Sequence, residues 1–126
     1  MSTLGRSLLI LQVVVFAGAA LMHAGILLHG HQHNAARNAE SVIALVLLVG
    51  LVSTILAPES SRAIALIVQG FALLGTIVGL FTIAVGIGPR TTIDLMLHGG
   101  MIVLLVTGLI VVGRWRLVSA GRHVTS

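Results

Sequence analysis

Four long apolar stretches, separated by short polar connections, occupy nearly all of this 126-residue chain. Hydrophobic residues make up 57% of the sequence and charged residues 8%, against roughly half and one quarter in an average soluble domain. A soluble domain of this length exposes too much surface to hide so many apolar side chains. The bilayer must therefore act as the solvent, and the sequence predicts an integral membrane protein.

Each apolar stretch is long enough to cross a bilayer as a helix. Helices are favoured over a barrel because the runs are continuous and lack the period-two alternation of barrel strands. The connections near 58–62 and 89–91 are short, which favours antiparallel neighbours. We therefore predict one all-α domain, residues 1–126, folded as an up-down-up-down four-helix bundle. The predicted spans are residues 8–28, 38–57, 63–88 and 92–113.

The distribution of arginine predicts the orientation of the chain, because lysine is absent. Positive charge favours the cytoplasmic side, so both termini are predicted to be cytoplasmic. Trp115, between two arginines, fits an interfacial anchor at that side. The arginines are expected to touch membrane lipid, and nothing indicates nucleic-acid binding. On the cytoplasmic side lie Arg6, Arg62, Arg114, Arg116 and Arg122, and on the other side lie Arg37 and Arg90.

Local signals mark the junction between the third and fourth spans. Gly86 and Pro89 are typical helix stops, and Thr91 followed by Asp94 resembles a capping box that opens the fourth helix. Within the third span, Gly75 and Gly79 form a G-x-x-x-G pair. Such spacing lets helices approach closely, and it suggests a homo-oligomer or a larger membrane complex.

Two histidines lie inside the predicted spans at matching depth. His23 is about 9 Å from the outer end of the first span, and His98 is at comparable depth in the fourth. Intramembrane ionisable residues are costly and are functional candidates, so each is the natural partner of the other. Together they could bind a b-type haem as axial ligands. The alternative is structural: hydrogen bonds across helices to Gln12, Gln69, Thr76 or Thr107.

A second candidate site involves Asp94 and the histidines of the outer connection. Asp94 and His98 share a helix face, so they could bind a proton or a metal ion, although helix capping at the wet interface is the stronger interpretation for Asp94. His29, His31 and His33 alternate, so an extended chain would point all three imidazoles to one side as metal ligands. The default for such a stretch is a solvated polar loop.

Enzymatic chemistry is not indicated by the sequence. Cysteine is absent, and acidic residues number three, so no cysteine nucleophile, paired carboxylate site or Ser-His-acid grouping is apparent. No charged residue lies at the centre of a span, which counts against an ion-coupled pump. We also expect Gln12 and Gln69 to bond to neighbouring helices.

The segment from Gln69 through Gly79 and Gly88-Pro89-Arg90-Thr91 to Asp94 and His98 resembles uncharacterised small bacterial four-span membrane proteins. That resemblance implies a bacterial inner membrane, with the histidine loop in the periplasm. In size and topology the chain is also similar to DoxX-like membrane proteins, some of which are associated with quinone or thiosulfate redox chemistry. The chain lacks the first-helix Glu of small multidrug exporters and the motifs of fluoride channels.

Taken together, these features predict a small membrane binding or accessory protein without catalytic turnover. In its sharper form, His23 and His98 hold a haem or similar cofactor, which makes the protein an electron-transfer or quinone-linked subunit. One alternative is a small transporter or metal-handling protein that uses the outer histidine loop. Another is a purely structural subunit of a membrane complex.

Overall fold

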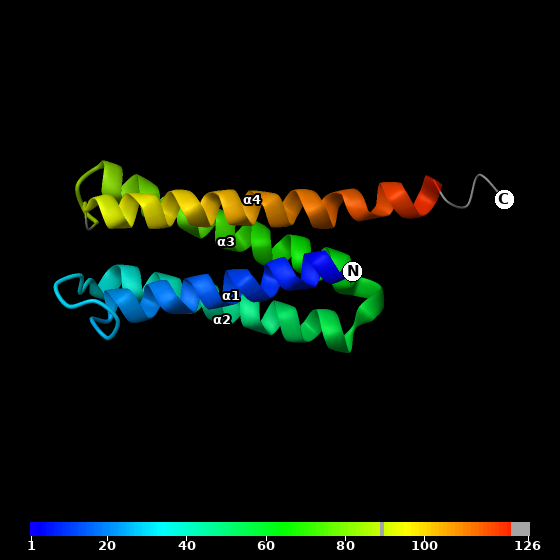
Figure 1. Cartoon of the computed structure of the whole chain (residues 1–126), viewed down its shortest axis with the longest axis horizontal. Helices are drawn as coiled ribbons and strands as arrows, with labels where there is room; N and C mark the ends of the chain where they lie inside the picture. Colours follow the sequence, from blue (N-terminus) through cyan, green and yellow to red (C-terminus); the bar gives the residue numbers. More distant parts are fainter. Residues whose placement is uncertain (89, 122–126) are drawn as a thin grey trace.

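The computed structural model describes residues 1–88 and 90–121, with side chains as far as residue 114, so the predicted anchor Trp115 lies outside the described side chains. The described part of the chain forms long α-helices and one short 3-10 helix, which confirms the all-α bundle (Figure 1). Four of its helices are long and apolar enough to cross a membrane. The elements are α1 (Thr3–His23), α2 (Asn34–Leu56), η1 (Pro58–Ser60), α3 (Ser61–Ala84) and α4 (Thr92–Gly121).

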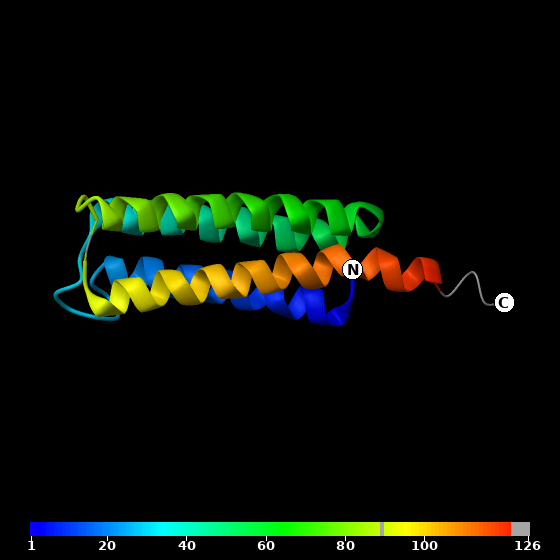
Figure 2. The ribbon, with the colours of Figure 1, turned by 90° about the horizontal axis from the view of Figure 1, so that it is seen from above.

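Consecutive helices run antiparallel and lie side by side, and α1 also packs against α4, so the bundle has four corners (Figures 1 and 2). The N-terminus lies toward the end where α4 finishes (Figure 1). We call the opposite end, where α1 and α3 stop and α2 and α4 begin, the His-loop end. The assignment of this end to the periplasm stays a prediction.

Glycines set where the helices stop at the His-loop end. The first helix ends at His23, not at the predicted Leu28, because Gly25 adopts a positive φ of 76°. The amides of Gly25 and Ile26 turn back to carbonyls in the last turn, which is the hydrogen-bond pattern of a Schellman motif. Gly86, with φ 83°, closes α3 in the same way, which confirms the stop predicted there.

The described side chains differ from those of a soluble protein in having an apolar outside as well as an apolar core. Large apolar residues such as Val14, Ile67 and Val103 are exposed on the outside of the bundle. Buried polar side chains lie inside, among them Gln12, His23, Glu40, Gln69, Asp94 and His98. This pattern is expected when lipid surrounds the helices, because polar groups then find partners only within the protein.

A hydrogen bond between two glutamines joins opposite corners of the bundle. Nε2 of Gln12 on α1 donates to Oε1 of Gln69 on α3 at 2.9 Å, and also contacts the carbonyl oxygen of Leu104 on α4 at 3.2 Å. The prediction that these amides bond to neighbouring helices is therefore confirmed. Because both side chains are fully buried, the bond fixes α1, α3 and α4 against one another.

Candidate functional site

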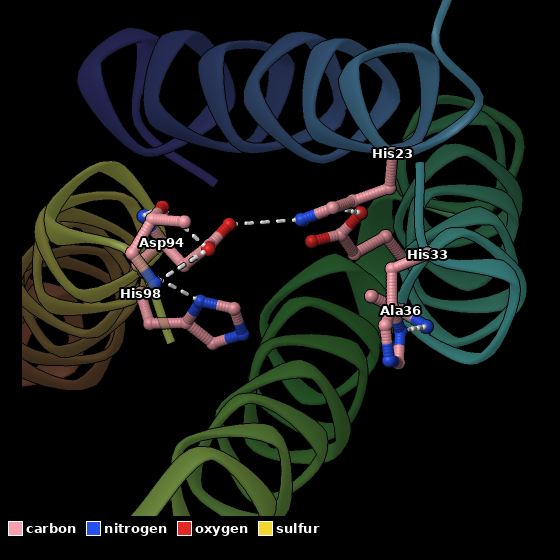
Figure 3. Close-up of polar contacts among 7 residues, drawn as sticks. His23, His33, Ala36, Asp94 and His98 are labelled. Atoms are coloured by element: carbon pink, nitrogen blue, oxygen red, sulfur yellow. Dashed lines mark hydrogen bonds and ion pairs between the residues drawn. The ribbon is translucent and has the colours of Figure 1, made fainter. Parts of the chain in front are cut away.

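The imidazole of His23 is held between two carboxylates from two other helices. Nδ1 lies 2.7 Å from Oε2 of Glu40 on α2, and Nε2 lies 3.1 Å from Oδ1 of Asp94 on α4. Figure 3 shows His23 reaching from α1 toward Asp94. The exposed fractions of His23, Glu40 and Asp94 are 1%, 4% and 0%. We call this buried cluster the Glu40–His23–Asp94 trio.

Glu40 is the member of the trio that sequence reasoning missed. It lies near the start of the predicted span 38–57, three residues before Ile43 and seven before Leu47. Residues at these spacings share a helix face, and Ile43 and Leu47 belong to the buried core. The sequence therefore contained a signal for Glu40 as a site residue, because an acidic residue near the end of a membrane helix shares the face of core residues.

Asp94 performs the predicted capping role and a second one. Its Oδ2 accepts hydrogen bonds from the amide of Thr91 at 3.1 Å and from its hydroxyl at 2.6 Å, while the Asp94 amide donates to Oγ1 of Thr91 at 3.2 Å. This reciprocal pattern confirms the capping box. Contrary to the expected contact with water, the Asp94 side chain is fully buried within the bundle. Its other oxygen contacts His23, so the N-terminus of α4 and the trio are one structure.

His98 lies beside the trio but makes a different contact from the predicted one. Its Nδ1 bonds to the backbone carbonyl oxygen of Asp94 at 2.8 Å, not to the carboxylate (Figure 3). Because a carbonyl oxygen only accepts, Nδ1 carries a hydrogen, and Nε2 is an acceptor when the ring is neutral. A Cβ added at Gly79 on α3 would stand 3.1 Å from this Nε2. Nε2 of His98 therefore lies against Gly79, where a larger side chain would crowd it.

The residues around His23 do not fit a bis-histidine haem in this arrangement. Axial ligation requires a free ring nitrogen on each histidine. Both ring nitrogens of His23 are hydrogen-bonded to carboxylates, whereas His98 has Nε2 to offer. If a ring nitrogen of His23 bound iron, the carboxylate oxygen now bonded to that nitrogen would be buried without a partner, which is costly. Both histidines bond to Asp94, His23 to its carboxylate and His98 to its backbone carbonyl, and carboxylates take the His23 nitrogens that a haem would need.

A cavity of about 240 Å³ lies next to the trio at the His-loop end, between α2, α3 and α4. Glu40 and His98 line it, and most of the other described lining residues are apolar or glycine. Ala39 and Val78 on its wall are exposed, so the cavity communicates with the surface between α2 and α3. Its inner wall includes Phe16 and Met101, each 1% exposed, which close it toward the middle of the bundle.

One carboxylate oxygen of a residue that lines the cavity has no partner. Oε1 of Glu40 is buried and makes no hydrogen bond to any described residue, whereas Oε2 is bonded to His23. Two threonines that also line the cavity donate their hydroxyls to carbonyls of their own helix, Thr76 to Ala72 at 2.8 Å and Thr82 to Gly79 at 2.7 Å. Glu40, which lines the cavity, therefore has one carboxylate oxygen to which the described neighbours supply no donor.

The histidine connection does not assemble the predicted metal site. Nδ1 of His33 accepts from the amide of Ala36 at 3.2 Å and caps α2 (Figure 3), while His29 is exposed. Among the described residues, no three His, Cys, Asp or Glu side chains are placed to hold a metal ion. Metal binding by His29, His31, His33 and Asp94 therefore stays a prediction.

The glycine pair of α3 faces the interior of the same chain. A Cβ at Gly75 would meet Ile43 of α2 at 2.8 Å, and one at Gly79 would meet His98 of α4. Both glycines also line the cavity. They therefore permit close packing within the bundle, and a role in oligomerisation stays a prediction.

No protein-family model, curated protein or solved structure matches this chain.

Proposed function

We propose that this chain is a small membrane binding protein, without catalytic turnover, that holds a lipid-soluble ligand in the cavity at the His-loop end. The buried, unpartnered Oε1 of Glu40 carries this proposal. A buried acceptor without a donor costs roughly 1–3 kcal/mol, and more if it is charged. A ligand that donates a hydrogen bond to this oxygen removes that cost.

The walls of the cavity support a lipophilic ligand that enters from the membrane. Their apolar character suits a hydrocarbon or ring system, and the opening between α2 and α3 lies on the exposed flank of the bundle. Drug-sized pockets measure about 300–1,000 Å³. A cavity of about 240 Å³ therefore suits one small ring system or the head of a longer lipid.

The other functions considered from the sequence have weaker support. A haem between His23 and His98 would need the nitrogen that Asp94 or Glu40 holds. A transporter needs a route to the opposite face, whereas buried Phe16 lies across the inner wall of the cavity. A ligand that donates a hydrogen bond makes direct use of the unpaired oxygen.

The proposal predicts selective uptake of a hydrogen-bond donor. We expect protein in phosphatidylcholine nanodiscs to bind 1-naphthol more tightly than naphthalene, which has the same rings but no hydroxyl. In Glu40→Gln, the amide oxygen can keep the bond to His23, so the NH2 group replaces the acceptor that faces the ligand. The expected loss of 1-naphthol affinity is about tenfold, which corresponds to 1.4 kcal/mol. Equilibrium dialysis, with protein-free nanodiscs subtracted, measures both compounds.

A steric variant tests the same site without changing the trio. Gly79→Ala places a methyl group beside Nε2 of His98, so 1-naphthol affinity should also fall. Gly70→Ala, on the same helix, meets nothing within 4 Å and is the matched control. Equal binding by all three variants and the parent protein, or equal binding of naphthalene and 1-naphthol by the parent, would contradict the proposal.

A further inference from the structure

The hydrogen bonds of the trio determine how many protons it holds. Each contact of His23 with a carboxylate requires one hydrogen between nitrogen and oxygen. A neutral imidazole carries one N–H, so the second hydrogen sits either on the ring, as an imidazolium, or on one of the carboxyl groups. The trio has the same net charge, −1, in either arrangement.

This negative charge is not balanced by a permanent cation in the described surroundings. The chain has no lysine, and no arginine is among the described residues that line the cavity. The nearest arginine in sequence, Arg37, donates from its guanidinium to Oδ1 of Asn38 at the exposed surface. His33 accepts a hydrogen bond at Nδ1, which requires a neutral ring. A buried uncompensated charge is costly in a medium of low dielectric constant.

Glu40 is the less fully bonded of the two carboxylates, and it is the one that lines the cavity. Asp94 receives two hydrogen bonds from Thr91 as well as its contact with His23. Glu40 has His23 alone, and its Oε1 is unpaired. His98, also on the cavity wall, offers the lone pair of Nε2 when neutral. Two residues with an acceptor atom, Glu40 and His98, therefore line an otherwise mostly apolar cavity beside a net negative charge.

We infer that the ligand of this cavity is a lipophilic organic cation with N–H donors, such as a protonated primary amine on a small ring system. The inference rests on the proposed function and names its ligand class. An ammonium group neutralises the trio and carries N–H donors that suit the carboxylate of Glu40 and Nε2 of His98, both on residues that line the cavity. A neutral phenol satisfies one acceptor and leaves the charge in place.

The inference predicts an affinity order among naphthalene derivatives. For protein in phosphatidylcholine nanodiscs at pH 7, we expect 1-naphthylmethylammonium to bind at least tenfold more tightly than 1-naphthol. Its N,N,N-trimethyl derivative keeps the charge but cannot donate, so it should bind more weakly than the primary amine. Equilibrium dialysis gives the three dissociation constants under the same conditions.

Charge variants separate this inference from the proposed function. Glu40→Gln brings the trio to zero net charge, so the preference for the amine over 1-naphthol should disappear. Glu59→Gln removes the same charge from the exposed residue of η1 and should leave the preference intact. If 1-naphthol binds as tightly as the amine and still depends on Glu40, the cation inference fails while the proposed function stands. If neither compound depends on Glu40 or on Gly79, both fail.

Discussion

Replacing His23 with leucine should destabilise the bundle by about 3–5 kcal/mol, the cost typical of breaking a buried charged pair by removing one partner. His23→Leu leaves the carboxylates of Glu40 and Asp94 buried without their common partner. Protonation of the carboxyl groups offsets part of this cost but not the lost hydrogen bonds. Unfolding of the purified protein by SDS in mixed micelles, followed by circular dichroism, measures the change in free energy.

Two further variants show whether the cost comes from the trio. His98→Leu removes a single bond to a backbone carbonyl and should cost only about 1 kcal/mol. The double variant His23→Leu with Glu40→Leu should be less destabilised than the sum of the two single variants, because the second change removes a group left unpaired by the first. Additive effects, or a larger loss in His98→Leu than in His23→Leu, would contradict the arrangement in Figure 3.

Replacing Gly108 with alanine should cost about 2–4 kcal/mol, because the glycine makes room for the glutamine bond at the middle of the bundle. A Cβ at this position would overlap Oε1 of Gln69 and Nε2 of Gln12, so at least one buried amide must give up its hydrogen bond. Overpacking and the unpaired amide cost about 1–3 kcal/mol each, and the better helix propensity of alanine returns up to about 1 kcal/mol. The same SDS titration measures the loss.

The control for this prediction lies on the same helix. A Cβ at Gly100 meets nothing within 4 Å, so Gly100→Ala should be neutral or slightly stabilising. In the background of Gln69→Ala, Gly108→Ala should cost less than it does alone, because one overlapping side chain is gone. If Gly108→Ala behaves like Gly100→Ala, the central glutamine bond is not a tight interhelical contact.

The interior of the bundle holds two groups of polar side chains with different roles: the Gln12–Gln69 pair and the Glu40–His23–Asp94 trio. The glutamine pair is neutral and holds three helices together, although Oε1 of Gln12 accepts no hydrogen bond from a described residue. The trio is satisfied on the side of Asp94 but not at Oε1 of Glu40, where the cavity begins. A membrane protein retains a buried, incompletely paired charge at a cost, and this is why the trio is the better candidate for function.

The sequence by itself predicted the features that depend on local chemistry. The four apolar runs predicted four helices, because in lipid a continuous apolar segment has few other ways to satisfy its backbone. The Thr91–Asp94 capping box and the stop at Gly86 were also readable, since each depends on residues a few positions apart. The end of α1 at His23 was missed because the residues after Gly25 remain apolar.

Only the tertiary structure decided which polar side chains meet. His23 is 17 residues from Glu40 and 71 from Asp94, and the three lie on different helices. In a soluble bundle, the alternation of apolar and polar residues indicates which face of each helix is buried. Here the outside is as apolar as the core, so the sequence pattern only weakly indicates which face of each helix is buried. The rotation of each helix is set by packing and by bonds such as Gln12 to Gln69, and that rotation joins His23 to two carboxylates.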